Sequence, residues 1–326
     1  MKEKKLTHLK KHWLDFDWWK NTAFPYVSSH LYRSLLNRYT YVYYSLNGVE
    51  FISIPNSDWD NLILFDACRY DYFVEQNIFN AEPERKYSSA PQTPIFLQKN
   101  FKNRELHDTV IISANPHQEI QLDDDQFHKV YHVWQTHWDD ELKTVHPRDV
   151  TEIAKQANRK HPQKRLIIHY MQPHAPFIGS WARENIGIYL GTTHAYKLAQ
   201  DGFHDCDTKN PYSMLKNGEI SREAIIQAYK ENIDLVMKYA ENLLDELQGK
   251  TVVSADHGEM FGEWAWPIPR KAYQHPPIMA KTLLEVPWLV IVDGTRKTIL
   301  SESPVQQENL RDEEVVERRL KHLGYK

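Results

Sequence analysis

The sequence predicts an α/β protein with a doubly wound, mostly parallel sheet. The first observation is a series of apolar runs of strand length, and the second is the helical pattern of the segments between them. Near-continuous apolar runs of four to seven residues are typical of parallel strands buried on both faces. The runs are "LILF" 62–65, "TVIISA" 109–114, "VYHVW" 130–134, "RLIIHYM" 165–171, "TVVSA" 251–255 and "PWLVIV" 287–292.

Helices are expected between these runs at 94–102, 148–160 and 221–247. The segment 221–247 places apolar residues three and four positions apart, as one face of a helix requires. Ser221 provides a suitable start for it, with Glu223 in the first turn, and a glycine follows its end. The alternation of strands and helices predicts helices on both faces of the sheet.

Composition excludes several classes of protein. The chain has 326 residues, with 40 basic and 44 acidic side chains, and this balance argues against nucleic acid as a partner. Cys68 and Cys206 show neither disulfide-framework nor zinc-site spacing. We expect no transmembrane segment, because no apolar run approaches about 18 residues. The basic N-terminus lacks the apolar core of a signal peptide, so a cytoplasmic location is expected.

The regions outside the central domain, 51–300, differ in character. Residues 1–50 form an aromatic, partly helical extension with two interpretations. Its aromatic side chains pack on the core, which is the preferred interpretation, or they make a weak contact with a membrane surface beside the lysines. Residues 178–220 have no clear period and are expected to be a loop insertion near the site. Residues 301–326 are expected to contain a charged C-terminal helix.

Polar residues follow several of the predicted strands. Parallel strands end at one edge of a sheet, and ligands bind beyond that edge. Asp66 ends the first strand, Asn115 follows the second, and His174 comes just after another. Asp256 and His257 end the strand at 251–255. We therefore expect these side chains to converge at one site.

Asp66, Asp256 and His257 have the chemistry of a metal site. Hard or borderline divalent cations take carboxylate oxygen and imidazole nitrogen, and three ligands leave positions open for a nucleophile and a substrate. A lone Asp at a strand end can instead cap a helix. Gly258 permits a sharp turn beside the ion, and Glu259 could orient a ligand from behind.

A nucleophile is supplied by the segment "KYSSAPQTPIF", residues 86–96. Thr93 precedes Pro94, so we expect it at the N-cap of the helix 94–102. A hydroxyl at a helix N-terminus lies where an anion is favoured, and a nearby cation could hold it as an alkoxide. Ser88 and Ser89 are alternative nucleophiles, since spacing alone does not decide between them.

Five ordered segments resemble motifs of the alkaline phosphatase superfamily, in its sulfatase-like branch. The resemblance covers about residues 60–295 and implies a three-layer α/β/α sandwich of the alkaline phosphatase type. It also implies Asp66, Thr93, Asp256 and His257 around one metal, with His174 and His275 near the substrate anion. Asn115 is expected to bind substrate from its place after a strand. The segments are "LFDACRYD", "SSAPQTP", "HYMQPHAPF", "SADHGEMFGE" and "YQHPPIMAKTLLEVPWLVI".

Three residues within these motifs receive structural roles. Arg69 and Asp71 match the first motif, and we expect them to pair with each other or to cap the following helix, with Arg69 a less certain site residue. We expect His169 to be a hydrogen-bonded core histidine.

Two departures from the family pattern affect the expected activity. No Asp-x-x-x-His pair stands where two-metal members carry one, so a single divalent cation is expected, with Mn or Zn favoured and Mg or Ca as alternatives. No Cys-x-Pro-x-Arg segment is present for conversion to formylglycine.

The resulting expectation is a metal-dependent hydrolase or transferase with a Thr nucleophile that acts on a phosphate ester. The anionic ester could be a glycan, a lipid headgroup or a small molecule. A sulfuric-ester hydrolase and a non-catalytic binding protein of the same fold are the alternatives.

Overall fold

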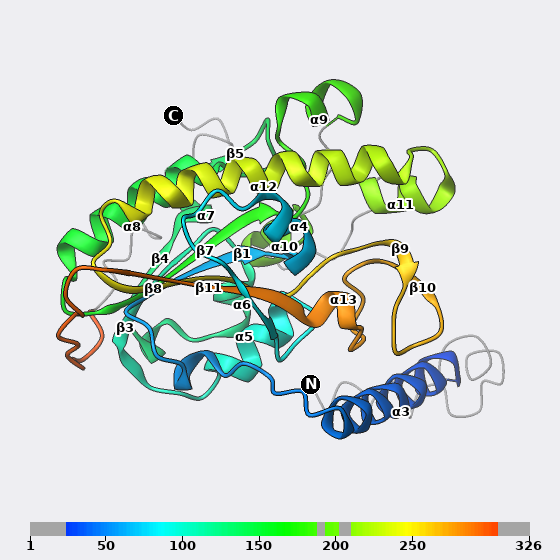
Figure 1. Ribbon diagram of the computed structural model, residues 1–326, viewed down its shortest axis with the longest axis horizontal. Coiled ribbons are helices and arrows are strands. Elements are labelled where there is room, and N and C mark those ends of the chain that lie inside the picture. The colour runs from blue at the N-terminus through cyan, green and yellow to red at the C-terminus, as the bar shows by residue number, and fades with distance from the viewer. Residues whose placement is uncertain (1–23, 188–192, 202–209, 306–326) are drawn as a thin grey trace.

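The computed structural model describes residues 24–187, 193–201 and 210–305, and its centre is a seven-stranded sheet (Figure 1). The strand order is β2-β11-β8-β1-β7-β3-β4. The strands are β1 Asn61–Asp66, β2 Glu84–Tyr87, β3 Leu106–Ser113, β4 Phe127–His132, β7 Arg165–Pro173, β8 Gly249–Ala255 and β11 Glu285–Asp293.

All six predicted strands are present, but one has the opposite direction from that expected. β4, β3, β7, β1 and β8 are parallel, whereas β11 runs antiparallel to both β8 and β2. The prediction of a parallel strand at 287–292 was wrong. An apolar run indicates that a strand is buried on both faces, but it does not indicate whether the strand runs parallel or antiparallel to its neighbours. β2 was missed because three of its four residues are charged and all four are exposed or only partly buried.

Helices cover both faces of this sheet and make a three-layer α/β/α sandwich. α8 and α12 lie on one face, and α5 and α6 lie on the other (Figure 1). The helices are α3 Phe24–Leu46, α4 Tyr70–Gln76, α5 Thr93–Phe101, α6 His117–Gln121, α7 Val133–Thr136, α8 Pro147–Lys160, α9 Ser180–Asn185, α10 Thr193–Asp201, α11 Pro211–Asn217, α12 Arg222–Leu244 and α13 Lys281–Leu284. Ser221 caps α12 as predicted, accepting a hydrogen bond from the Ala224 backbone N–H at 3.1 Å.

Shorter elements complete the chain. Among the described residues, two short 3₁₀ helices and two small hairpins lie outside the central sheet, and one of these hairpins joins the strand-end motif at 256–259 to His275. They are the 3₁₀ helices Ile54–Asn56 and Asp124–Gln126, and the strand pairs β5 Trp138–Asp139 with β6 Thr144–Val145 and β9 Met260–Trp264 with β10 Lys271–Gln274.

The two faces of each central strand contribute to separate cores. In β1, Ile63 and Phe65 pack with the residues of α8 and α12, whereas Leu62 and Leu64 pack with those of α5. All six residues of β1 are buried. This burial on both faces explains why the strands read as continuous apolar runs, and it holds the strand ends rigidly in register.

Three boundary predictions need correction or stay open. Residues 178–220 are not a loop, because their described parts contain α9, α10 and α11, which are too short and too polar to show a clear period. The N-terminal extension contains α3, and its first 23 residues lie outside the described part. The predicted C-terminal helix also falls outside it from residue 306 onward. No helix within the described ranges is long and apolar enough to cross a membrane.

Glycine is required at position 258 because a side chain there would collide with the neighbouring backbone, and not because the chain makes an unusual turn. A Cβ at this position would lie 2.2 Å from the carbonyl oxygen of Thr282, and the Gly258 N–H donates to Leu283 O at 2.8 Å. We expect Gly258→Ala to destabilise the protein by about 1–3 kcal/mol and to lower activity, because the loop carrying Asp256 and His257 must shift.

Urea unfolding monitored by circular dichroism, together with metal content, measures this effect. Gly218→Ala is the control, since nothing lies within 4 Å of a Cβ there and its φ of +74° introduces backbone strain alone. Equal metal content and equal stability in Gly258→Ala and the parent protein would contradict the close packing.

Candidate active site

Four adjacent strands bring the predicted residues together. β8, β1, β7 and β3 are neighbours in the sheet, and Asp256, Asp66, His174 and Asn115 lie at or just beyond their carboxyl ends. Thr93 reaches the same edge from the start of α5. The convergence expected from the strand ends is confirmed for these residues.

The first cluster consists of Asp66, Asp256 and His257, with the Thr93 hydroxyl among them. Thr93 Oγ1 donates to Asp256 Oδ2 at 2.7 Å and lies 3.2 Å from His257 Nε2 and 3.4 Å from Asp66 Oδ2. One ligand atom from each of the three residues lies within 4.8 Å of the others, and all three side chains are buried. His257 Nδ1 lies 2.8 Å from Gly258 O and donates to it, which leaves Nε2 with its lone pair toward the cluster.

The electrostatics of this cluster fit a bound cation. Burial and the adjacent Asp256 carboxylate raise the pKa of Asp66 well above its ordinary value. Burial also acts on Asp256, but His257, His169 and the Thr93 hydroxyl hold the pKa of its carboxyl below the ordinary value. Burial lowers the pKa of His257, which favours the neutral ligand form. Two buried carboxylates and a neutral imidazole are a donor set for a divalent cation.

Thr93 is the first residue of α5, not its N-cap as predicted. Gln92 is the N-cap, with extended backbone angles and no side-chain cap bond. The hydroxyl of Thr93 therefore turns to Asp256 and does not cap its own helix. Ser88 and Ser89, the alternative nucleophiles, are engaged elsewhere. Ser88 Oγ donates to the Asp256 backbone carbonyl, and Ser89 Oγ accepts from Asn100 Nδ2 at 3.2 Å.

The loop after β1 is held in a strained conformation by α12. Ala67 has a φ of 58°, in the left-handed region, and its N–H donates to Asp256 Oδ1 at 3.0 Å. Tyr229 of α12 donates to Ala67 O at 2.6 Å and accepts from the Arg69 N–H at 2.9 Å. Non-glycine residues adopt this conformation at a cost in conformational free energy, which the surrounding contacts offset. Backbone strain of this kind is found most often at functional sites.

Arg69 has the structural role expected for it. Its Nε and Nη2 donate to the two carboxylate oxygens of Asp71 at 2.9 and 2.6 Å, so the predicted pair is confirmed. Nη1 donates to Glu259 O at 3.3 Å and pairs with Glu263. Arg69 thus ties the loop after β1 to the loop after β8.

Asn115 supports Asp66 directly. Its Nδ2 donates to Asp66 Oδ2 at 2.5 Å, and its Oδ1 accepts from the His117 N–H at 2.8 Å. This arrangement orients the Asp66 carboxylate from the side of β3, as outer partners of metal ligands do. The assignment of Asn115 to substrate binding stays a prediction.

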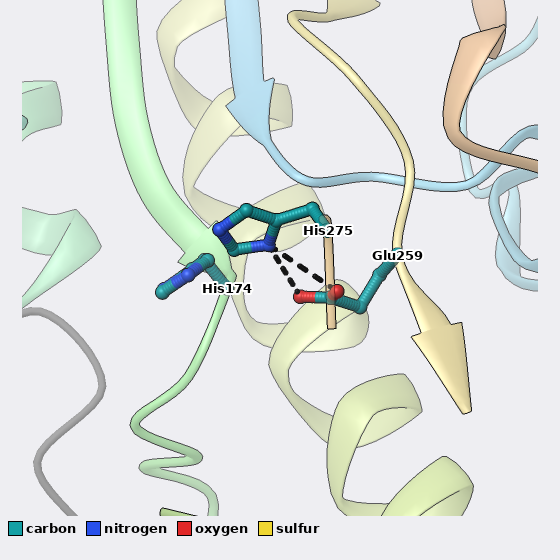
Figure 2. A group of neighbouring side chains, drawn as sticks. All are labelled: His174, Glu259 and His275. Atoms are coloured by element: carbon teal, nitrogen blue, oxygen red, sulfur yellow. Dashed lines mark hydrogen bonds and ion pairs between the residues drawn. The ribbon is translucent and has the colours of Figure 1, made fainter. Parts of the chain in front are cut away.

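A second cluster consists of His174, Glu259 and His275 (Figure 2). His275 Nδ1 lies 3.2 and 3.3 Å from the two Glu259 oxygens, drawn as dashed lines in Figure 2. The His275 ring centroid is 5.1 Å from that of His174 and 4.8 Å from that of His257, so His275 connects the clusters. Sequence spacing did not reveal this group of three, because Glu259 was expected to orient a ligand of the first cluster.

Burial shapes the charge states of the second cluster. It lowers the pKa of His174 and of His275 to about 4 and raises that of Glu259 to about 7. His174 Nδ1 lies 2.5 Å from Ala175 O, which directs Nε2 outward. Tyr212 of α11 donates to Glu259 at 2.7 Å, so the insertion does reach the site. Two neutral imidazoles and a carboxylate could hold a second cation or contact the substrate anion.

The structure corrects the prediction made for the role of His169. It is buried but is not a hydrogen-bonded core histidine, because its Nε2 has no hydrogen-bond partner among the described residues. That atom lies 4.0 Å from Asp66 Oδ2 and 3.9 Å from Asp256 Oδ2, within the first cluster.

Comparisons with known proteins add structural likeness only. No family model and no curated protein matches the chain. The solved structures similar to it include phosphoethanolamine transferases and sulfatases.

Three of these structures illustrate the range. Lipooligosaccharide phosphoethanolamine transferase A (EptA) of Neisseria meningitidis, an integral membrane protein, is 12% identical with a TM-score of 0.44, over 73% of this chain and 49% of its own. The periplasmic domain of Escherichia coli EptC, in complex with Zn, is 12% identical with a TM-score of 0.45, over 75% and 76%. A 2-O GAG sulfatase is 12% identical with a TM-score of 0.42, over 75% and 65%. The chain therefore matches about half the length of full-length EptA.

Proposed function

We propose that the protein is a metal-dependent enzyme that hydrolyses or transfers a phosphate ester through a covalent phosphate on Thr93. The observation that carries this proposal is the position of the Thr93 hydroxyl, which touches Asp256 and His257 at the N-terminus of α5. A hydroxyl that only capped a helix would have no reason to lie among buried metal-type ligands.

The residues present fit a divalent cation at the first cluster. Asp66, Asp256, His257 and Thr93 would hold it, and Asn115 would keep the Asp66 carboxylate in place. When bound there, a cation would lower the pKa of the hydroxyl and neutralise charge on the ester oxygens. Zn and Mn suit a mixed carboxylate and imidazole set best, and Mg or Ca are the alternatives.

The chain's own groups then account for the chemical step. Asp256 Oδ2 accepts the Thr93 hydrogen bond and is the group placed to take its proton. Thr93 Oγ1 forms a bond to phosphorus while the bond from phosphorus to the leaving oxygen breaks. The N-terminus of α5 favours the anionic group at this position. Attack by water or by an acceptor alcohol on the phosphothreonine releases phosphate or product and restores Thr93.

The second cluster provides contacts for the rest of the ester. His174 and His275, neutral at pH 7, can donate an N–H to ester oxygens or hold a second cation with Glu259. A threonine cannot become the formylglycine with which sulfatases work. For this reason we propose phosphorus, and not sulfur, as the reacting centre.

Hydrolysis assays on purified protein test this function. Generic phosphomonoester, phosphodiester and sulfate-ester substrates are each assayed with added Zn, Mn, Mg or Ca after chelation. We expect turnover of a phosphate ester that requires one of these metals. Preference for the sulfate ester would favour the sulfatase alternative, and metal binding without turnover of any ester would favour a binding protein.

A further inference from the structure

The helix α3 and the β9–β10 hairpin expose large apolar side chains on a common surface. On α3, Leu35, Tyr39, Val42 and Leu46 lie four, three and four residues apart and therefore form a stripe on one side of the helix. Leu46 is 82% exposed, and Trp264 and Trp266 of the hairpin segment are 61% and 55% exposed. We call these residues the aromatic face: Leu35, Tyr39, Val42, Leu46, Trp264 and Trp266.

Direct contacts join the two parts of the aromatic face. Trp266 Nε1 donates to Tyr43 OH at 3.0 Å, and the two rings meet edge to face with centroids 6.3 Å apart. The other side of α3 is anchored through Thr40 and Tyr44, both buried, and Tyr44 OH donates to Met279 O at 3.1 Å. Packing on the core thus accounts for one side of α3 and leaves the stripe without a partner in the described chain.

The charge around the aromatic face is positive. The 23 residues of α3 include no acidic residue, and Arg38, Arg270 and Lys271 are exposed beside it. The one acidic side chain of the hairpin, Glu263, is paired with Arg69. Lysines also outnumber acidic residues in the sequence that precedes α3.

We propose that the aromatic face rests on the surface of an anionic lipid bilayer. Trp and Tyr carry apolar rings with a polar tip, which suits the boundary between headgroups and acyl chains. Exposed Arg and Lys at the rim add attraction to anionic headgroups. A second copy of the chain is a poorer occupant, because it would bring a face of the same positive charge against this one.

The hairpin links the aromatic face to the site. β9 begins directly after Glu259, and β10 ends directly before His275 (Figure 1). A bilayer on this surface would therefore contact the hairpin whose two ends adjoin Glu259 and His275 of the second cluster. Binding to lipid does not depend on the proposed reaction and is measured without it.

Cosedimentation of the full chain with lipid vesicles tests the proposal. Vesicles of phosphatidylcholine alone are compared with vesicles that also contain phosphatidylglycerol. We expect binding to the anionic vesicles, weakened by salt, and a roughly tenfold loss of affinity in Leu46→Ser/Trp264→Ser and in Arg270→Glu/Lys271→Glu. Leu300→Ser and Lys102→Glu/Arg104→Glu are the matched controls on exposed positions elsewhere, and they should bind like the parent.

Circular dichroism checks that each variant is folded, and sedimentation velocity measures its oligomeric state. The proposal is overturned if the folded parent does not bind anionic vesicles, or if both face variants bind as well as the controls. A dimer that Leu46→Ser/Trp264→Ser dissociates would also overturn it, because the occupant would then be a second copy.

Discussion

Replacing Thr93 by alanine should lower kcat by a factor on the order of 10⁴ or more, while the fold and the metal content stay close to those of the parent. Removal of an attacking group has effects of this size in enzymes that form covalent intermediates. Alanine removes only the hydroxyl and one methyl group of the buried threonine, so we expect a small loss of stability beside the loss of kcat. Steady-state kinetics with the preferred phosphate ester, metal analysis and thermal unfolding measure the three quantities.

Two controls separate this role from a structural one. Thr93→Ser keeps a hydroxyl and should retain measurable turnover, whereas Ser89→Ala, whose hydroxyl contacts Asn100, should be fully active. Peptide mapping of the parent quenched during turnover should place the phosphate on Thr93. Thr93→Ala protein with parent-like activity, or an adduct on Ser88 or Ser89, would contradict the assignment.

Replacing Asp256 by asparagine should weaken metal binding by more than about 100-fold and lower activity by at least about 10³-fold. Asp256 contributes both its charge to the first cluster and the acceptor for the Thr93 hydrogen bond. The amide removes the negative charge at nearly constant volume, so the loss follows from charge and not from packing. Metal content by mass spectrometry after dialysis, at equal protein concentration, measures the first effect.

Asp60→Asn is the matched control. Asp60 is also a buried carboxylate next to β1, but it lies at the opposite end of the strand, where it pairs with Arg296 and accepts from the Lys250 N–H at 2.7 Å. This variant should lose stability and keep its metal. If Asp66→Asn and Asp256→Asn both retained the metal of the parent, the cation would bind elsewhere.

The stoichiometry in the same measurement distinguishes the two clusters. One ion per chain agrees with the single cation expected from the sequence, held at Asp66, Asp256 and His257. A second ion that Glu259→Gln alone removes would belong to His174, Glu259 and His275, the cluster that only the structure brought together.

The sequence by itself determined the strands, their burial and the position of most of the site. Apolar runs mark strands buried on both faces, and parallel strands present their ends at one edge, so Asp66, Asp256 and His257 could be placed together from their order alone. The pairing of Arg69 with Asp71 could also be predicted from the sequence, because the two residues are only two positions apart.

Only the tertiary structure decided the rest, because it depends on direction and distance between segments remote in sequence. Hydrophobicity does not distinguish an antiparallel β11 from a parallel one, and spacing does not reveal that His169 points at two carboxylates. Spacing left Ser88 and Ser89 as alternatives to Thr93, and only the structure gives the contacts of the three hydroxyls on which the proposal of Thr93 rests. Likewise, the periodicity of α3 shows two apolar sides, and contacts from residues more than 200 positions away decide which side is buried and which is left exposed.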